Sequence, residues 1–370
     1  MATKYWVGGS GTWDSLDTTH WANSSGGAGG TSTPIYTDTV IFDNNSGTAG
    51  TTVVVSIYNS GGGGTGTATC AIFDTSACTA VTALRFDAAG TVTSDPRLEI
   101  WRSSNLSSKT SIGTVAGAYY YNLIFYQQNN TTCTLATNGA VIYDLYLSSV
   151  GLNDTVTLLS DLTITNRLFL SYGTLNANGY NVTVSEVYNV FAVGNSYIYM
   201  GSGTWTVTGD WSTYYNTCTI VAGTSTLILQ TGGWLYFYPK SGSTFYNITA
   251  KLGKTSFGGI APTVRIRTNI TCSTFDAITQ NTYGPDTIDI GSSNTLTVTS
   301  SFMPTTTGRR VIYIEDGTVA KASGVVATNN LNILNNTATG GAQFFAGNLS
   351  TNAGGNSGWQ FGGGLFVLFM

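Results

Sequence analysis

Residues 173–185 read GTLNANGYNVTVS, two short alternating segments on either side of an Asn-Gly turn. Residues 291–300, GSSNTLTVTS, are a second version of this phrase, and GSGTW occurs both at 9–13 and at 201–205. Imperfect repetition at wide intervals is typical of repeat architectures, in which each unit buries its apolar face against its neighbours. The sequence therefore predicts stacked β rungs.

The segments between these phrases have the pattern of short strands. In Leu296-Thr297-Val298 the apolar pair lies on one face and Thr297 on the other, which is the two-residue period of a half-buried strand. No segment shows a capped period of 3.6, so we expect almost no helix. Two all-β arrangements stay open. The wide repeats favour a parallel β-solenoid, whereas the pairs Asn138-Gly139 and Asn178-Gly179 would suit antiparallel β-sandwich modules.

The composition fits a β protein with a buried core. The chain has 370 residues, of which 42% are hydrophobic and only 9% charged, and it contains 46 glycines. Thr, Ser and Asn must therefore cover much of the surface, and these side chains suit strands and turns better than helix faces. The net charge of -4 gives no electrostatic reason to bind nucleic acid or an anionic membrane. No run reaches the roughly 20 apolar residues of a membrane span, and no secretory signal is recognisable, so we expect neither insertion nor general export.

The cysteines are odd in number and form no CxxC pair, which argues against a metal cluster. We expect small apolar side chains inside the rungs, as in a protein folded in a reducing cytoplasm, and leave a Cys70–Cys78 pair open. The five positions are Cys70, Cys78, Cys133, Cys218 and Cys272.

Three segments follow from these patterns. Residues 1–45, rich in Trp, Gly and Asp, are predicted to form a cap, residues 46–303 a β-solenoid, and residues 304–370 a C-terminal β region with an apolar tail. The tail is either a buried terminal strand or a strand given to a neighbouring subunit, and we predict that it mediates assembly. Its residues are Leu365, Phe366, Val367, Leu368 and Phe369.

Both ends of the chain resemble known proteins. YWVGG at 5–9, GTWD at 11–14, His20-Trp21, Thr33-Pro34 and DTVIFD at 38–43 resemble a cap found ahead of right-handed parallel β-helices in bacterial surface proteins and phage virion proteins. His20 departs from it, since Asn would be expected there. NSGWQF at 356–361 resembles a C-terminal ending of phage structural proteins. The resemblance implies a tailed-phage fibre or decoration protein of the virion, assembled in the bacterial cytoplasm as a homo-oligomer, often a trimer, with other virion proteins.

Residues for catalysis are few. His20 is the one histidine, and with Asp14 and Asp17 it more commonly bonds local backbone than a metal. Asp43 begins a calcium-like loop that lacks the closing glutamate. Carboxylates from different rungs could converge into a pair that cleaves glycosides. We expect no catalytic residue, metal or cofactor; the carboxylates that could pair are Asp276, Asp286, Asp289, Glu186 and Glu315 with Asp316.

Aromatic side chains are the remaining candidates for contacts. In residues 234–238, WLYFY, both faces of a strand are aromatic or apolar, so one face meets another subunit or stays exposed. A seam between subunits is the first interpretation and stacking on a glycan the second, and Tyr119–Tyr121 and Tyr197–Tyr199 show the same pattern. Lys251, Lys254, Arg265 and Arg267 are interpreted first as an ordinary solvated face and second as a contact for an acidic glycan or partner protein. The predicted partner or glycan contacts are Trp205, Trp234, Tyr236 and Tyr238.

Three functions compete. The first is a non-enzymatic virion structural protein, the second a receptor-binding tailspike that recognises or cleaves a host surface polysaccharide, and the third a bacterial surface adhesin. The missing secretion signal counts against the third.

Overall fold

The computed structural model describes residues 1–57, 67–88, 97–113, 122–125, 132–147, 154–189, 195–214, 218–253, 261–279, 286–305 and 311–362. These residues form strands and turns and no helix, so the predicted all-β class is confirmed. The chain divides into two compact units. Unit 1 comprises residues 1–185 and 190–199, and unit 2 comprises residues 186–189 and 200–370.

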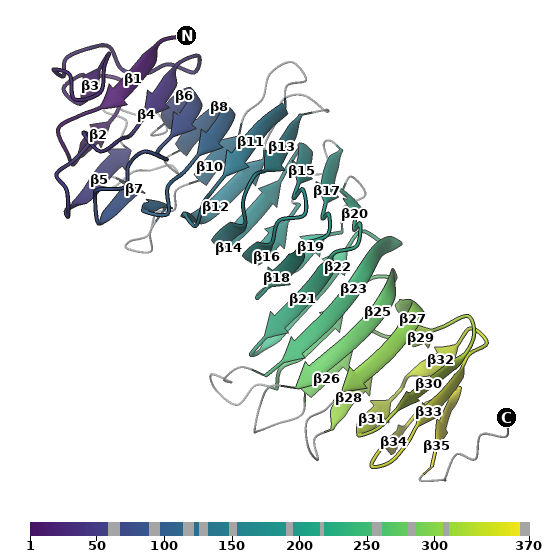
Figure 1. Cartoon of the computed structure of the whole chain (residues 1–370). Coiled ribbons are helices and arrows are strands. Elements are labelled where there is room, and N and C mark those ends of the chain that lie inside the picture. Colours follow the sequence, from purple (N-terminus) through teal and green to yellow (C-terminus); the bar gives the residue numbers. More distant parts are fainter. Residues whose placement is uncertain are drawn as a thin grey trace. The chain divides into compact units, whose positions relative to one another are not determined.

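Figure 1 labels most of the strands. In the first part of the chain they are β1 (Thr3–Trp6), β2 (Gly11–Trp13), β3 (Trp21–Ala22), β4 (Thr39–Ile41), β5 (Thr52–Ile57), β6 (Thr67–Asp74), β7 (Ala83–Ala88), β8 (Arg97–Asn105), β9 (Thr110–Ile112), β10 (Asn122–Phe125), β11 (Thr132–Ala136), β12 (Val141–Leu147), β13 (Thr155–Leu158), β14 (Leu162–Leu170), β15 (Gly173–Asn176), β16 (Val182–Tyr188) and β17 (Ser196–Tyr199). The later strands are β18 (Thr204–Val207), β19 (Trp211–Thr213), β20 (Cys218–Val221), β21 (Thr226–Thr231), β22 (Trp234–Pro239), β23 (Ser243–Leu252), β24 (Thr263–Ile266), β25 (Ile270–Thr279), β26 (Asp286–Asp289), β27 (Thr295–Thr305), β28 (Ile312–Glu315), β29 (Thr318–Ala320), β30 (Val325–Thr328), β31 (Leu331–Leu334), β32 (Thr337–Thr339), β33 (Gln343–Ala346), β34 (Thr351–Gly354) and β35 (Trp359–Phe361).

Parallel pairing dominates both units. Apart from the antiparallel pair β1–β3, the strands for which the structure gives a register run parallel, as in β5–β7, β6–β8, β22–β24 and β26–β28. Parallel partners are separated along the chain by one or two intervening strands, so each strand pairs with a strand of the next rung. This is the pairing of a solenoid-like stack and not of antiparallel sandwich modules.

The register places like residues above one another, and apolar ladders result. In unit 2, Leu227 pairs with Ile248, Ile248 with Phe275, and Phe275 with Phe302. The first three of these side chains have no exposed surface and Phe302 has very little. Burying aliphatic and aromatic side chains in this way supplies the main favourable term for folding, about 1.5 to 3 kcal/mol for each.

The segment predicted to form a cap contains an aromatic cluster in unit 1. Trp6, Trp13, Trp21 and Phe42 are buried against one another with ring centroids 5.0 to 6.5 Å apart. His20 stacks flat on Trp6, with centroids 4.6 Å apart, and its Nδ1 lies 2.7 Å from the carbonyl oxygen of Val7. The imidazole thus covers a tryptophan face and bonds local backbone, which explains how His fits where the resemblance predicts Asn.

The acidic residues Asp14 and Asp43 accept hydrogen bonds from nearby backbone, as in a polar turn. Asp14 Oδ1 accepts the N–H groups of Leu16 and Asp17 at 2.7 and 2.5 Å, and Asp43 Oδ1 accepts that of Asn45 at 2.8 Å. In the part of the chain that the structure describes, no three His, Cys, Asp or Glu side chains are grouped to hold a metal ion.

The Asn-Gly pairs are corners of the stack. Asn178 and Gly179 both have positive φ, 54° and 84°, as the hairpin prediction requires. The flanking strands take other partners, however: β15 pairs with β13 and β17, and β16 pairs with β14. The left-handed turn therefore redirects the chain to another face of its rung.

All five cysteines are buried, which confirms their prediction as small interior side chains. Burial raises the pKa of Cys78 to about 11 and that of Cys272 to about 12. No disulfide joins Cys70 to Cys78, the pair that the sequence left open. The predicted boundaries at 45 and 303 and the assembly tail stay predictions, and the tail residues Leu365–Phe369 lie outside the described residues.

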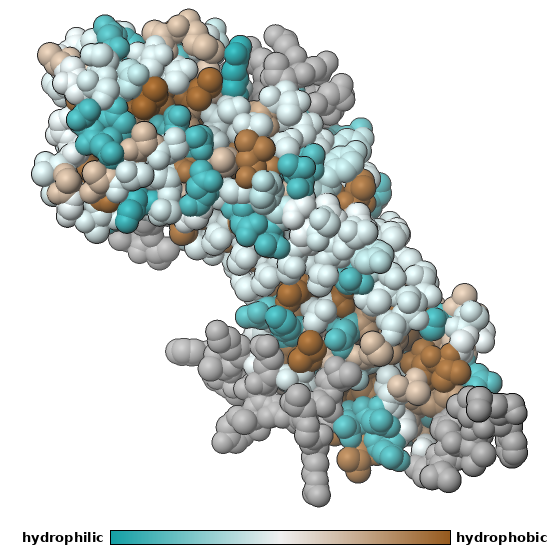
Figure 2. Space-filling model, viewed as in Figure 1, coloured by the Kyte–Doolittle hydropathy of each residue, from teal (hydrophilic) through white to brown (hydrophobic). Residues whose placement is uncertain are grey.

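Only 9% of the residues are charged, so few charged side chains are available for the surface. Figure 2 shows one face on which pale residues of intermediate hydropathy predominate, with teal and brown residues scattered among them. Such a surface follows from the Thr, Ser and Gly content of the outward strand positions. A gathering of charged and aromatic side chains on one strand face is therefore a distinctive feature.

Candidate ligand-binding flank

The outward face of β22 carries three of the four aromatic residues predicted as contacts. Leu235 and Phe237 point inward and are fully buried, whereas Trp234, Tyr236 and Tyr238 take the outward positions of the same strand. Trp234 is 54% exposed and Tyr238 is 36% exposed. A tryptophan with half its surface in solvent beside two tyrosines is a surface suited to contact with a partner.

Trp205, the fourth predicted contact, lies in the interior. It is 0% exposed, its Nε1–H donates to the carbonyl oxygen of Met200 at 3.3 Å, and Trp211 packs 6.1 Å away. The prediction of a partner or glycan contact is therefore wrong for Trp205. The signal was in the alternation of β18, because Trp205 shares its face with Val207, which is also buried.

Arg265, on the neighbouring strand β24, lies against the ring of the exposed Trp234. The β22–β24 register pairs Trp234 with Thr263 and Tyr236 with Arg265. The Arg265 guanidinium carbon lies 4.3 Å from the centroid of the Trp234 ring and 5.3 Å from that of Tyr236. Arg265 Nη1 also donates to Tyr236 Oη at 2.7 Å. A guanidinium over an aromatic face attracts the ring quadrupole, so this contact holds the indole in place.

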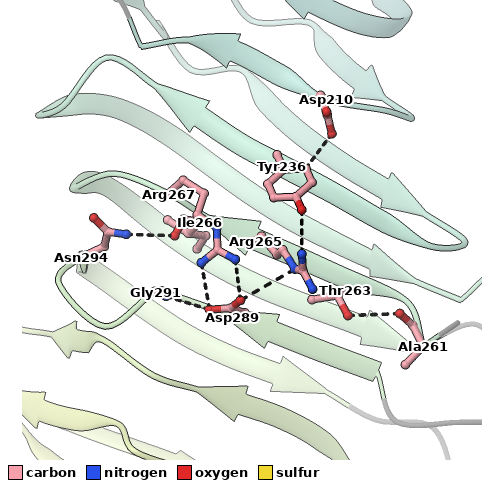
Figure 3. Close-up of polar contacts among 10 residues, drawn as sticks. All are labelled: Asp210, Tyr236, Ala261, Thr263, Arg265, Ile266, Arg267, Asp289, Gly291 and Asn294. Carbon is pink, nitrogen blue, oxygen red and sulfur yellow. Dashed lines mark hydrogen bonds and ion pairs between the residues drawn. The ribbon is translucent and has the colours of Figure 1, made fainter.

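Asp289, on the following strand β26, contacts both Arg265 and Arg267 (Figure 3). Arg267 Nη1 and Nη2 donate to Asp289 Oδ1 and Oδ2 at 3.3 and 2.8 Å, and Arg265 Nε lies 3.8 Å from Oδ2. The N–H of Gly291 donates to Oδ1 at 2.8 Å. The two-pronged Arg267 contact matches the planar shapes of guanidinium and carboxylate and fixes both. We call Trp234, Tyr236, Tyr238, Arg265 and Asp289 the β22 flank.

This arrangement corrects the interpretation of the basic stretch as an ordinary solvated face. Arg265 and Arg267 are partly buried and shared between an aromatic pair and Asp289. Lys251 lies on β23, and Lys254 is outside the described residues. The contact between Arg265 and Tyr236 could not be predicted from the sequence, because 29 residues separate the two.

Tyr238 continues the aromatic surface to a residue that sequence reasoning missed. Tyr214 stacks on Tyr238 with ring centroids 4.3 Å apart and an interplanar angle of 18°. Both rings are partly exposed. Tyr214 follows β19, and the β19–β22 register sets Ser212 beside Tyr238, so the two rings come from adjacent rungs.

Two carboxylate pairs lie near the flank. Glu315 is the register partner of Asp289, and burial, with Asp289 and Asp316 nearby, raises the pKa of the Glu315 carboxyl. Asp210 accepts the backbone N–H of Tyr236 at 2.8 Å, and burial, together with Glu186, raises the pKa of Asp210.

Asp276 and Asp286 were also proposed from the sequence. Asp276 is the register partner of Thr249 and Met303, and Asp286 is buried. Asp289 accepts hydrogen bonds from Arg267 and the Gly291 N–H, which fix the orientation of its carboxylate. The flank therefore combines aromatic platforms with fixed hydrogen-bonding groups, a composition that suits binding of a hydroxyl-rich ligand.

Comparison with protein-family models, curated proteins and solved structures finds no match. Within the described residues there is no helix of the length and apolarity needed to cross a membrane. Tyr119–Tyr121 of the aromatic predictions lie outside the described part of the chain, whereas Tyr197 and Tyr199 stack loosely in unit 1 with centroids 6.5 Å apart.

Proposed function

We propose that this chain is a non-enzymatic structural protein of a tailed-phage virion, a fibre or decoration subunit that assembles as a homo-oligomer. The proposal includes a right-handed, closed parallel β-helix, made in the bacterial cytoplasm and docked to other virion proteins. What supports the structural role is the in-register stacking of parallel strands over apolar ladders in both units. The virion location is supported by the resemblance of the opening and closing segments to phage proteins.

Labelled electron microscopy tests this proposal. Fab fragments raised against the purified chain should mark regular positions on phage particles and leave particles from a deletion mutant unmarked. Sedimentation equilibrium of the purified chain should give twice its mass or a higher integer multiple, whereas the mass of a single chain would contradict the homo-oligomer. Particles that bind a capsid Fab but never the chain-specific Fab would overturn the virion proposal.

A second function, recognition of a host surface polysaccharide, is favoured by one observation. Trp234 is exposed, and the Arg265 guanidinium lies 4.3 Å from its ring centroid. The ring therefore offers an open face to a ligand while its position is fixed. Pyranose rings have apolar C–H faces that pack on such rings, while their hydroxyls need donors and acceptors such as those around Asp289.

Binding of polysaccharide from the host surface is measured with Trp234→Ala and with a matched control, Tyr246→Ala. Tyr246 lies on β23 and is 42% exposed, so the control removes another exposed ring from the same unit. We expect Trp234→Ala alone to lose binding. Equal binding by both variants would contradict this second function, and release of reducing sugar that Asp289→Asn or Glu315→Gln abolishes would contradict the non-enzymatic role.

A further inference from the structure

The outward row of β22 continues beyond the strand to a lysine. Side chains alternate from Trp234 to Pro239, and the next outward position after Tyr238 is Lys240. With a rise of about 3.3 Å for each residue, the row from Trp234 to Lys240 spans roughly 20 Å. A row of this length fits several sugar units of a polymer laid along the strand.

Lys240 borders a hollow of about 200 Å³ at the end of this row. Its lining is rich in hydroxyl groups and contains no carboxylate: it consists of Cys218, Thr219, Ile220, Lys240, Ser241, Gly242, Ser243 and Thr244. Gly242 has a φ of +80°, and a Cβ there would meet no atom within 4 Å, so the turn leaves the hollow open.

Lys240 differs from the nearby Arg265 and Arg267 in having no carboxylate partner in the described part of the chain. Arg265 and Arg267 both approach Asp289, at 3.8 and 2.8 Å. Among the described residues, Lys240 has no carboxylate within 4.0 Å and no side-chain hydrogen bond. An unpaired ammonium beside hydroxyl donors is complementary to an anion, and lysine binds such groups as a point charge.

We propose that the Lys240 hollow is an anion subsite and that the β22 flank therefore takes an anionic polysaccharide. The inference rests on the polysaccharide recognition proposed above and adds the class of sugar. Trp234, Tyr236 and Tyr238 stack the rings, and Lys240 with the hydroxyls of Thr219 and Ser243 receives a carboxylate or sulfate carried by the chain. An acidic protein segment would satisfy Lys240 but would leave the aromatic row without its ring partners.

Affinity electrophoresis of the full chain tests the subsite with two probes, each beside its neutral counterpart. The probes are polygalacturonate with its carboxyl-reduced form and dextran sulfate with dextran. The variants are Lys240→Gln, Lys240→Arg, which keeps the charge, and Lys109→Gln, which removes the same charge from an exposed turn of unit 1. We expect Lys240→Gln to weaken binding of an anionic probe about tenfold, which corresponds to about 1.4 kcal/mol. Lys240→Arg and Lys109→Gln should bind as the unaltered chain does.

The outcomes separate the subsite from the flank. Equal losses in Lys240→Gln and Lys109→Gln would mean unspecific attraction and would overturn the subsite. Equal binding of a probe and its neutral counterpart would also overturn the subsite while leaving polysaccharide recognition intact. If the unaltered chain bound neither form of either probe, the polysaccharide flank itself would be overturned.

Discussion

Replacing Asp289 by Asn tests whether the arginine network holds the β22 flank together. The change keeps the shape of the side chain but removes the charge that faces Arg267 and Arg265. A hydrogen bond to a charged group contributes about 1.5 to 3 kcal/mol, whereas an exposed ion pair contributes at most about 1 kcal/mol. The Arg267 and Asp289 side chains are 29% and 15% exposed, so solvent screens part of the interaction. We expect Asp289→Asn to lower local stability by about 2 kcal/mol.

Hydrogen exchange followed by mass spectrometry measures this loss of local stability strand by strand, because local opening sets the exchange rate of protected amides. Peptides that cover β24 and β26 should exchange about thirtyfold faster in Asp289→Asn, the rate equivalent of about 2 kcal/mol. Asp87→Asn is the matched control: its partner Arg85, at 2.7 Å, is 36% exposed, and we expect a smaller change around β7. If β24 and β26 exchanged less than threefold faster, the network would be no stronger than a surface ion pair, and it would not hold the β22 flank together.

Three further predictions concern titration, packing and thiol chemistry. The pKa of the Glu315 carboxyl is raised in the native state, so the native state binds the carboxyl proton more tightly than the unfolded state does. The free energy of unfolding therefore falls as the pH rises from the usual glutamate range through the native pKa. Glu315→Gln should therefore raise the urea midpoint at neutral pH and leave it unchanged below that range; a lower midpoint at neutral pH would contradict this. Phe237→Ala, which empties a site packed 5.3 Å from Phe245, should cost about 3 to 5 kcal/mol in urea unfolding, and a loss below 1 kcal/mol would mean that the site is not tightly packed. A disulfide reagent at pH 8 should label Cys78 and Cys272 only after unfolding, since burial raises their pKa to about 11 and 12; rapid labelling of the native chain would contradict their burial.

The alternation within each strand was readable from the sequence, because it depends only on neighbouring residues. In WLYFY, the period of two assigns Leu235 and Phe237 to one face and the other three to the opposite face, which is how β22 lies. The same rule, applied to Trp205 and Val207, would have placed Trp205 inside. Local patterns thus identify faces, and the error at Trp205 came from judging tryptophan by its type instead of its position.

Contacts between rungs were not readable, because the spacing between partners is irregular. Tyr236 and Arg265 are 29 residues apart, whereas Arg267 and Asp289 are 22 apart. Connections of different lengths intervene, so no fixed period predicts which residues become neighbours. The Asn178-Gly179 turn was ambiguous for a related reason: its left-handed backbone serves a hairpin and a corner of a stack equally well, and only the pairing partners distinguish them.

The scarcity of charge is what makes the β22 flank informative. About a quarter of residues are charged in ordinary globular domains, where an arginine near a tryptophan would be unremarkable; here 9% are charged. Packing onto apolar neighbours would lower the free energy of an exposed indole ring. The Arg265 guanidinium, 4.3 Å from the Trp234 ring, instead holds the ring in its outward position on β22. Arg265 is in turn oriented by Tyr236 Oη and by Asp289 on the next rung. A ring fixed in this way loses little conformational entropy when a ligand stacks on it, so the network favours binding although it need not touch the ligand.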